Sequence, residues 1–159
     1  MKHGLNYLVC MLLGVLFSCS EALDPQPNKY SEIFTGTSKK AWQISSIQLK
    51  EENKSPQTFG LPPCMADDEY IFYANVEKTY EISNGFSKCD SAEPDMIVSD
   101  SWEFSNANAT MNIIMPLLAD YKLPFIVREA SEKEMTLEIF LDEKNTTSYR
   151  FNFTAKKGN

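Results

Sequence analysis

From residue 40 onward, apolar and polar residues alternate along the chain with a period of two. Trp42 and Ile44, for example, are separated by Gln43 and followed by Ser45. Successive side chains of a β-strand point to opposite faces, so this alternation is typical of strands with one buried face, whereas a helix would spread such residues around its surface. Further apolar groups with this spacing are Tyr70 and Phe72; Tyr80 and Ile82; Trp102 and Phe104; Met111, Ile113 and Met115; Met135, Leu137, Ile139 and Leu141; and Tyr149, Phe151 and Phe153.

Turn-forming residues separate these runs at intervals of about ten residues, the spacing of a sheet built from short strands. Such strands predict an all-β fold, in which an antiparallel meander of about eight strands forms a small barrel or a strongly curled sheet. The stretch 116–120 is expected to form either a single helical turn or a loop. The turn signals are Gly60 with Pro62 and Pro63, Asn75, Asn84-Gly85, 90–94, 106–108 and 142–145.

The chain begins with Lys2 and His3 and a mostly apolar run over residues 5–17. This run is too short to span a bilayer and fits the apolar core of a secretory signal peptide. It ends in Leu-Phe-Ser-Cys at 16–19, which resembles the lipobox of bacterial lipoproteins. The resemblance implies removal of residues 1–18, attachment of fatty acyl chains such as palmitate to Cys19, and anchoring in the outer membrane. A plain signal peptide that ends at a chance cysteine is the alternative.

The residues after Cys19 are polar and include Pro25 and Pro27. An extended chain reaches at most about 3.3–3.6 Å per residue, so such a stretch would lift a folded domain off the bilayer. We therefore expect a flexible tether over residues 19–35 and one barrel domain over residues 36–159, with order beginning between residues 33 and 40.

Four cysteines occur in the chain: Cys10, Cys19, Cys64 and Cys89. Removal of the signal peptide takes the first, acylation uses the second, and one pair remains in an oxidising compartment. Cys64 lies just before the expected hairpin 70–82, and Cys89 lies just after the turn that follows it. Antiparallel pairing brings such flanks together, so we expect a Cys64–Cys89 disulfide. A zinc site is a poor alternative, because the mature chain has no further Cys or His to complete four ligands.

His3 is the only histidine and leaves with the signal peptide. Histidine-based nucleophile systems, proton shuttles and metal sites are therefore not expected, and we predict no enzymatic activity, no cofactor and no metal. Paired-carboxylate chemistry would depend on Asp67, Asp68 and Glu69. Neighbours on a strand point to alternate faces, so a solvated turn is the simpler interpretation of these acids, and a calcium site is a further alternative.

The charge and the remaining apolar runs limit the expected partners. The net charge is −7, and the chain has only two arginines and no basic cluster. Binding to nucleic acid is therefore not expected. No second apolar run approaches the length of a spanning helix, so the lipid on Cys19 is the expected membrane attachment.

Several motifs occur in a distinctive order along the chain: Gly36 with Lys-Ala-Trp at 40–42, Cys-x-x-Asp-Asp at 64–68, Gly-x-x-x-Cys at 85–89, Trp-x-Phe at 102–104 and the closing run 149–156. Together they resemble bacterial lipocalin-like lipoprotein domains of the calycin type, over about residues 33–157. The Gly-x-Trp of true lipocalins is absent. The resemblance implies a small antiparallel barrel with an apolar interior, in a family whose members mostly have no assigned activity.

These features are consistent with two classes of function. The first is a binding module tethered to the outer membrane that takes a small apolar ligand or an envelope protein partner. The second is a structural accessory subunit of a cell-envelope complex, with a filled barrel and no ligand. An eight-stranded barrel is wide enough either for side chains alone or for one small ligand. The aromatic residues expected to face inward, as ligand contacts or as core, are Trp42, Phe72, Tyr80, Trp102, Phe125 and Phe151.

Overall fold

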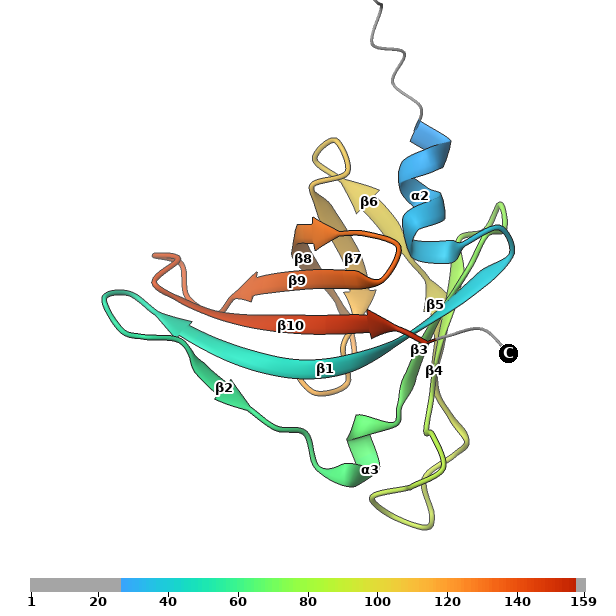
Figure 1. The fold of residues 1–159 in the computed structure, drawn as a ribbon, viewed down its shortest axis with the longest axis horizontal. Helices are drawn as coiled ribbons and strands as arrows, with labels where there is room; N and C mark the ends of the chain where they lie inside the picture. Colours follow the sequence, from blue (N-terminus) through green and yellow to red (C-terminus); the bar gives the residue numbers. More distant parts are fainter. Residues whose placement is uncertain (1–26, 157–159) are drawn as a thin grey trace, which may run out of the picture.

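The computed structural model describes residues 27–156, which are drawn in colour in Figure 1. The predicted signal peptide (1–18), Cys19 and the first part of the tether lie outside the described residues. Two helices and ten strands occur within them: α2 (Pro27–Thr35), β1 (Lys39–Glu51), β2 (Gln57–Phe59), α3 (Pro63–Ala66), β3 (Glu69–Tyr73), β4 (Thr79–Ser83), β5 (Met96–Ser101), β6 (Glu103–Ser105), β7 (Thr110–Ile114), β8 (Lys122–Ala130), β9 (Glu134–Phe140) and β10 (Thr147–Ala155).

The strands form one antiparallel sheet that curls into a nearly closed barrel. Their order is β5-β4-β3-β1-β10-β9-β8-β7-β6, and the short β2 pairs with β1 off this path. β5 and β6 stand at the two ends of the order but are consecutive in the chain, separated only by Trp102. They act as one bent strand that pairs with β4 on one side and with β7 on the other. Counting them as one leaves eight strand positions, which confirms the predicted all-β meander of about eight strands.

The predicted inner rows point into the barrel. Trp42 and Ile44 of β1 are buried, whereas Gln43 between them is partly exposed. Leu141 is the exception, because β9 ends one residue before it and its side chain is 51% exposed. The apolar residues that form the core are Phe34, Trp42, Ile44, Tyr70, Phe72, Tyr80, Ile82, Trp102, Met111, Ile113, Met115, Phe125, Met135, Leu137, Ile139, Phe151 and Phe153.

The aromatic residues predicted to face inward are packed against one another. The ring of Phe72 stacks on Tyr80 with centroids 5.5 Å apart and meets Trp102 edge-on at 5.9 Å. Phe125 and Phe151 make a similar edge contact at 5.9 Å. These contacts fill the middle of the barrel with side chains. The solvent-exposed fraction lies between 0% and 2% for each of the six residues Trp42, Phe72, Tyr80, Trp102, Phe125 and Phe151.

Helix α2 closes the end of the barrel that lies at the top of Figure 1. Phe34 is fully buried, and its ring lies 5.4 Å from Tyr30 and 5.2 Å from Phe104. The indole Nε1–H of Trp42 donates to the carbonyl of Phe34 at 2.8 Å, so the helix is tied to β1 as well as packed on the core.

This helix corrects the last part of the predicted flexible tether, because residues 27–35 are helical. Proline is tolerated in the first turn of a helix, where its missing N–H has no partner to lose. Tyr30 and Phe34 are one turn apart and provide the apolar stripe that buries the helix.

The stretch predicted as a single helical turn or a loop is a hydrogen-bonded turn. The carbonyl of Met115 accepts from the amides of Leu118 at 2.8 Å and Ala119 at 3.0 Å. This turn, residues 115–119, follows β7 and lies at the end of the barrel opposite α2. We call that end the mouth, and α3 and the loop 84–95 lie at the same end in Figure 1.

Candidate functional site at the barrel mouth

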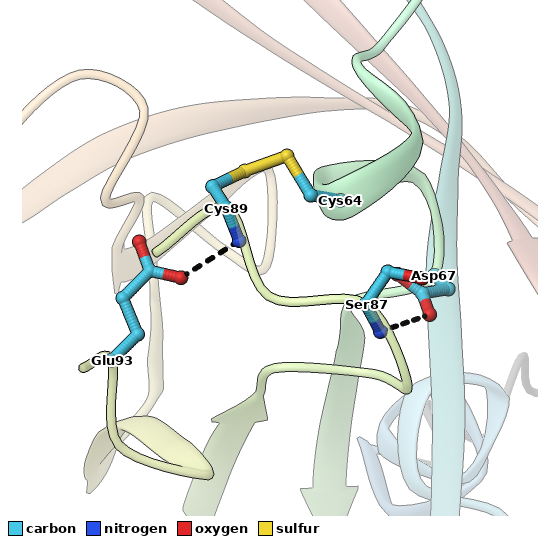
Figure 2. The surroundings of a disulfide bond; sticks show 5 residues. All are labelled: Cys64, Asp67, Ser87, Cys89 and Glu93. Carbon is cyan, nitrogen blue, oxygen red and sulfur yellow. Dashed lines mark hydrogen bonds between the residues drawn. A yellow bond between two sulfur atoms is a disulfide. The ribbon is translucent and has the colours of Figure 1, made fainter. Parts of the chain in front are cut away.

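The disulfide predicted between Cys64 and Cys89 is present and forms part of the mouth (Figure 2). β3 and β4 pair with Tyr70 opposite Ile82, so the segments that flank this hairpin return to the same place. The two Cα atoms lie 5.0 Å apart. The bond therefore joins α3 to the loop 84–95.

Asp67 ties the same two segments together a second time. Its Oδ2 accepts the backbone N–H of Phe86 at 2.7 Å and that of Ser87 at 3.0 Å. Gly85 precedes them, and a Cβ at this position would overlap both the carboxyl group and the carbonyl of Asp67. Only glycine fits this close approach, and the two hydrogen bonds hold the loop next to Asp67.

Next to these two connections lies a partly enclosed hollow of about 230 Å³ at the mouth, which we call the mouth hollow. Inward residues of β1, β3 and β4 form its floor, and the turn 115–119 covers one side. Its polar groups come from Asp68, Asn84 and Glu93. The complete lining is Ile44, Cys64, Met65, Asp68, Tyr70, Ile82, Asn84, Cys89, Glu93, Ile97, Pro116 and Leu117.

Asp68 is the polar group in this hollow whose environment is least usual. Burial raises its pKa, the negative charges of Asp67 and Glu93 raise it further, and the result is about 6. Its Oδ1 is buried and accepts no hydrogen bond from any described residue. An unpaired buried acceptor costs about 1–3 kcal/mol, so a donor brought in by a ligand would be stabilised here.

The three adjacent acids considered for catalysis point in different directions. Asp67 caps the loop 84–95, Asp68 faces the mouth hollow, and Glu69 forms an ion pair with Lys156 near the end of the chain. Among the described residues, no three Asp, Glu, Cys or His side chains are placed to hold a metal ion. Asp67, Asp68 and Glu69 therefore do not face one another across a common substrate position.

The aromatic residues predicted as ligand contacts lie deeper than the mouth hollow, and none of the six lines it. Phe151 alone lines a second, more open hollow of about 270 Å³ on the other side of the turn 115–119. That second hollow is apolar, being formed by Ile47, Phe59, Leu117, Leu118, Tyr149 and Phe151. The turn 115–119 contributes to both hollows, since Leu117 lines each of them.

Sequence reasoning missed most of the mouth hollow. Its walls come from segments far apart in the chain, such as Ile44, Asn84 and Leu117, and no local pattern relates them. The disulfide was the one available signal, since both of its cysteines line the hollow.

A scan against protein-family models finds no model that matches this sequence, and a search of curated proteins finds no similar chain. Neither of the two helices in residues 27–156 has the length and hydropathy needed to cross a membrane.

Proposed function

We propose that this chain is a lipid-anchored, lipocalin-like binding protein of the cell envelope that acts by binding and not by catalysis. Its ligand occupies the mouth hollow. The observation that carries this proposal is the buried, unpartnered Oδ1 of Asp68 in an otherwise mostly apolar enclosure. The lipobox-like end of the signal sequence and the cysteine count support the anchor on Cys19.

The chemistry of the hollow supports a ligand with an apolar body and a cationic or hydrogen-bond-donating end. Ile44, Ile82 and Leu117 offer apolar contacts, whereas the carboxylates of Asp68 and Glu93 favour a positive group. A volume of about 230 Å³ suits a small molecule and not a full lipid acyl chain. We therefore place the expected small apolar ligand at the mouth and not among the core aromatics.

The tether would hold the α2 end of the barrel nearest the bilayer. Pro27, the first residue of α2, comes eight positions after Cys19 in the chain, so the start of the helix can stand at most about 29 Å from the lipid. The mouth lies at the opposite end (Figure 1). The hollow would then open away from the membrane, toward soluble ligands or envelope partners.

A structural accessory subunit of an envelope complex is the second candidate. The observation that favours it is the filled interior, in which the inward aromatic residues contact one another. Under this alternative the mouth hollow holds only solvent, and an envelope protein partner docks on the outer wall.

Native mass spectrometry of the exported protein in detergent tests both parts of the proposal. We expect fatty acyl chains on Cys19 and a co-purified small molecule that carries a basic or donor group. Cys19→Ser should release the protein from the membrane fraction. Membrane retention of that variant would contradict the anchor. If the native and denatured masses are equal, no ligand is bound, and that result would favour the accessory subunit.

A further inference from the structure

Both arginines of the chain bind one glutamate on the outer wall of the barrel. Arg150 of β10 lies directly across from Glu138 of β9 in the strand ladder and donates Nε–H to its Oε1 at 3.0 Å. The Nε–H of Arg128 donates to the other oxygen, Oε2. Arg128 is the extra residue at the register shift of β8 between Val127 and Glu129. Such a bulge changes the direction of a side chain, and the side chain of Arg128 reaches this carboxylate.

Glu138 belongs to the outward row of β9, yet its side chain is only 2% exposed because the two arginines and Ser148 cover it. Ser148 Oγ donates to Oε1 at 2.7 Å. Burial raises the pKa of Glu138, but the hydrogen bonds from Arg150, Ser148 and Arg128 outweigh burial and lower it overall. The carboxylate therefore stays ionised and fixes both guanidinium groups.

The glutamate uses only part of what the two arginines can donate. A guanidinium carries five N–H donors, and both arginines present Nε to Glu138. Of the Nη atoms, only Nη2 of Arg150 also donates to Glu138, with its Oε2 at 3.5 Å. Among the described residues, the remaining Nη groups have no acceptor. They are preorganised donors on side chains that are 40% and 30% exposed.

These donors face a groove of about 360 Å³ whose charge is opposite in sign to that of the whole chain. Four cations and three carboxylates line it, an excess of one positive charge, whereas the chain carries −7. One of those carboxylates, Glu51, is paired with Lys54 at 2.9 Å, which leaves the groove more positive still. The lining is Lys50, Glu51, Glu52, Arg128, Glu138, Phe140, Lys144, Asn145, Thr146, Ser148 and Arg150.

We propose that this groove on the outer wall binds an oxyanion, a phosphate or carboxylate group, between the free edges of Arg128 and Arg150. Lys50 and Lys144 also line the groove and add two point charges. Arginine forks match the geometry of such groups, and fixed guanidiniums lose little freedom on binding. The site is separate from the mouth hollow, so it does not depend on the proposed function.

The test is an NMR titration with inorganic phosphate, using the mature chain with Cys19→Ser so that no lipid is attached. We expect saturable shifts at the side-chain N–H signals of Arg128 and Arg150. The double variant Lys50→Gln, Lys144→Gln should bind more weakly by roughly fivefold or more, because two charges near the anion are lost. Lys133→Gln, a surface lysine outside the groove, is the matched control and should change nothing.

Glu138→Gln adds a test in the opposite direction. It keeps the shape of the side chain and removes a negative charge, so phosphate affinity should rise. A purely structural arginine cluster predicts no saturable binding in any variant, and that result would overturn the proposal. So would equal losses in Lys133→Gln and in the double variant, since these would indicate a general charge effect. If Glu138→Gln fails to fold, the lysine variants still decide the matter.

Vesicles distinguish the source of the anion. Co-sedimentation of the unlipidated chain with phosphatidylglycerol vesicles but not with phosphatidylcholine vesicles, reversed by inorganic phosphate, would support the site and identify a lipid headgroup. Saturable phosphate binding without co-sedimentation would support the site with a soluble anion as its ligand.

Discussion

The hydroxyl of Tyr80, on β4, accepts the backbone N–H of Ile114, at the end of β7, at 2.8 Å. The β6–β7 ladder stops at Glu103 opposite Asn112, so Ile114, two residues further on, has no strand partner on that side. The tyrosine hydroxyl supplies the acceptor that a neighbouring strand would otherwise provide. This contact joins the two parts of the sheet where the bent strand β5–β6 leaves one for the other.

Removing this hydroxyl should weaken barrel closure. Tyr80→Phe keeps the ring and leaves the amide of Ile114 without its acceptor, which costs about 1–3 kcal/mol of unfolding free energy. Burial raises the pKa of Tyr80 to about 12, so ionisation of the phenol does not complicate the comparison near neutral pH. Urea unfolding measures the loss, and faster hydrogen exchange at Ile114 locates it. Unchanged exchange at that amide would show that the contact is not needed for closure.

The bend between β5 and β6 offers a matched pair of variants. Trp102 is buried and Glu103 is exposed. Trp102→Asp removes a large aromatic side chain and buries a charge, and should cost several kcal/mol, because truncation of tryptophan alone costs about 3–5 kcal/mol. Glu103→Lys should leave the melting temperature almost unchanged. Equal melting temperatures for the two variants would contradict the inward and outward assignment.

The disulfide should contribute a large part of the stability of the mouth. Cys64 and Cys89 are 25 residues apart in sequence, and closing a loop of this size contributes about 3–4 kcal/mol by restricting the unfolded chain. The variant Cys64→Ser, Cys89→Ser should lose about that much in chemical denaturation. Reduction of the wild-type protein is the control and should have the same effect. A double variant as stable as the oxidised protein would show that Asp67 alone holds the loop.

Asp68 gives a pH dependence of unusual sign. Its pKa is about 6 in the folded chain against an ordinary value of 3.8, so the folded state binds more protons than the unfolded state between these values. Stability from this group should therefore fall as pH rises from about 4 to about 6 and stay lower above that range. The carboxyl is only partly buried, so the expected loss is about 1 kcal/mol after allowance for solvent screening.

Asp68→Asn is the measurement for this effect. The variant should melt at a higher temperature than the wild type at pH 7–8, and the two curves should converge below about pH 3, where the wild-type carboxyl is protonated in both states. A constant difference at every pH would indicate a packing effect and contradict ionisation as the cause.

Much of the barrel could be predicted because its strands obey a local rule. β3, β4, β7 and β9 have one buried face and therefore show alternation in the sequence. β5 has no such alternation, since none of its side chains is buried, and its sequence therefore carries no periodic signal. Helix α2 was missed because Pro25 and Pro27 suggest an extended chain, whereas its burial depends on the distant Phe104.

The two candidate sites could be predicted much less well. The mouth hollow depends on loops brought together by Cys64–Cys89 and the turn 115–119. The groove depends on a register shift in β8 that places Arg128 beside Glu138. From its place in the alternating sequence of β9, Glu138 would be expected to be an ordinary exposed acid. In both cases the site forms only through tertiary contacts.

The most direct test of the proposed function is an NMR titration of the unlipidated mature chain with n-hexylammonium, a small probe with an apolar body and a cationic end. We predict saturable shifts at Ile44, Ile82 and Leu117, with weaker binding of hexanoate. Asp68→Asn should reduce the affinity about tenfold, since hydrogen bonds to charged groups contribute about 1.5–3 kcal/mol. The control Asp120→Asn removes an exposed acid at the same end of the barrel and should leave the affinity unchanged. Absence of saturable shifts at these residues, or equal affinity in Asp68→Asn, would contradict ligand binding at the mouth.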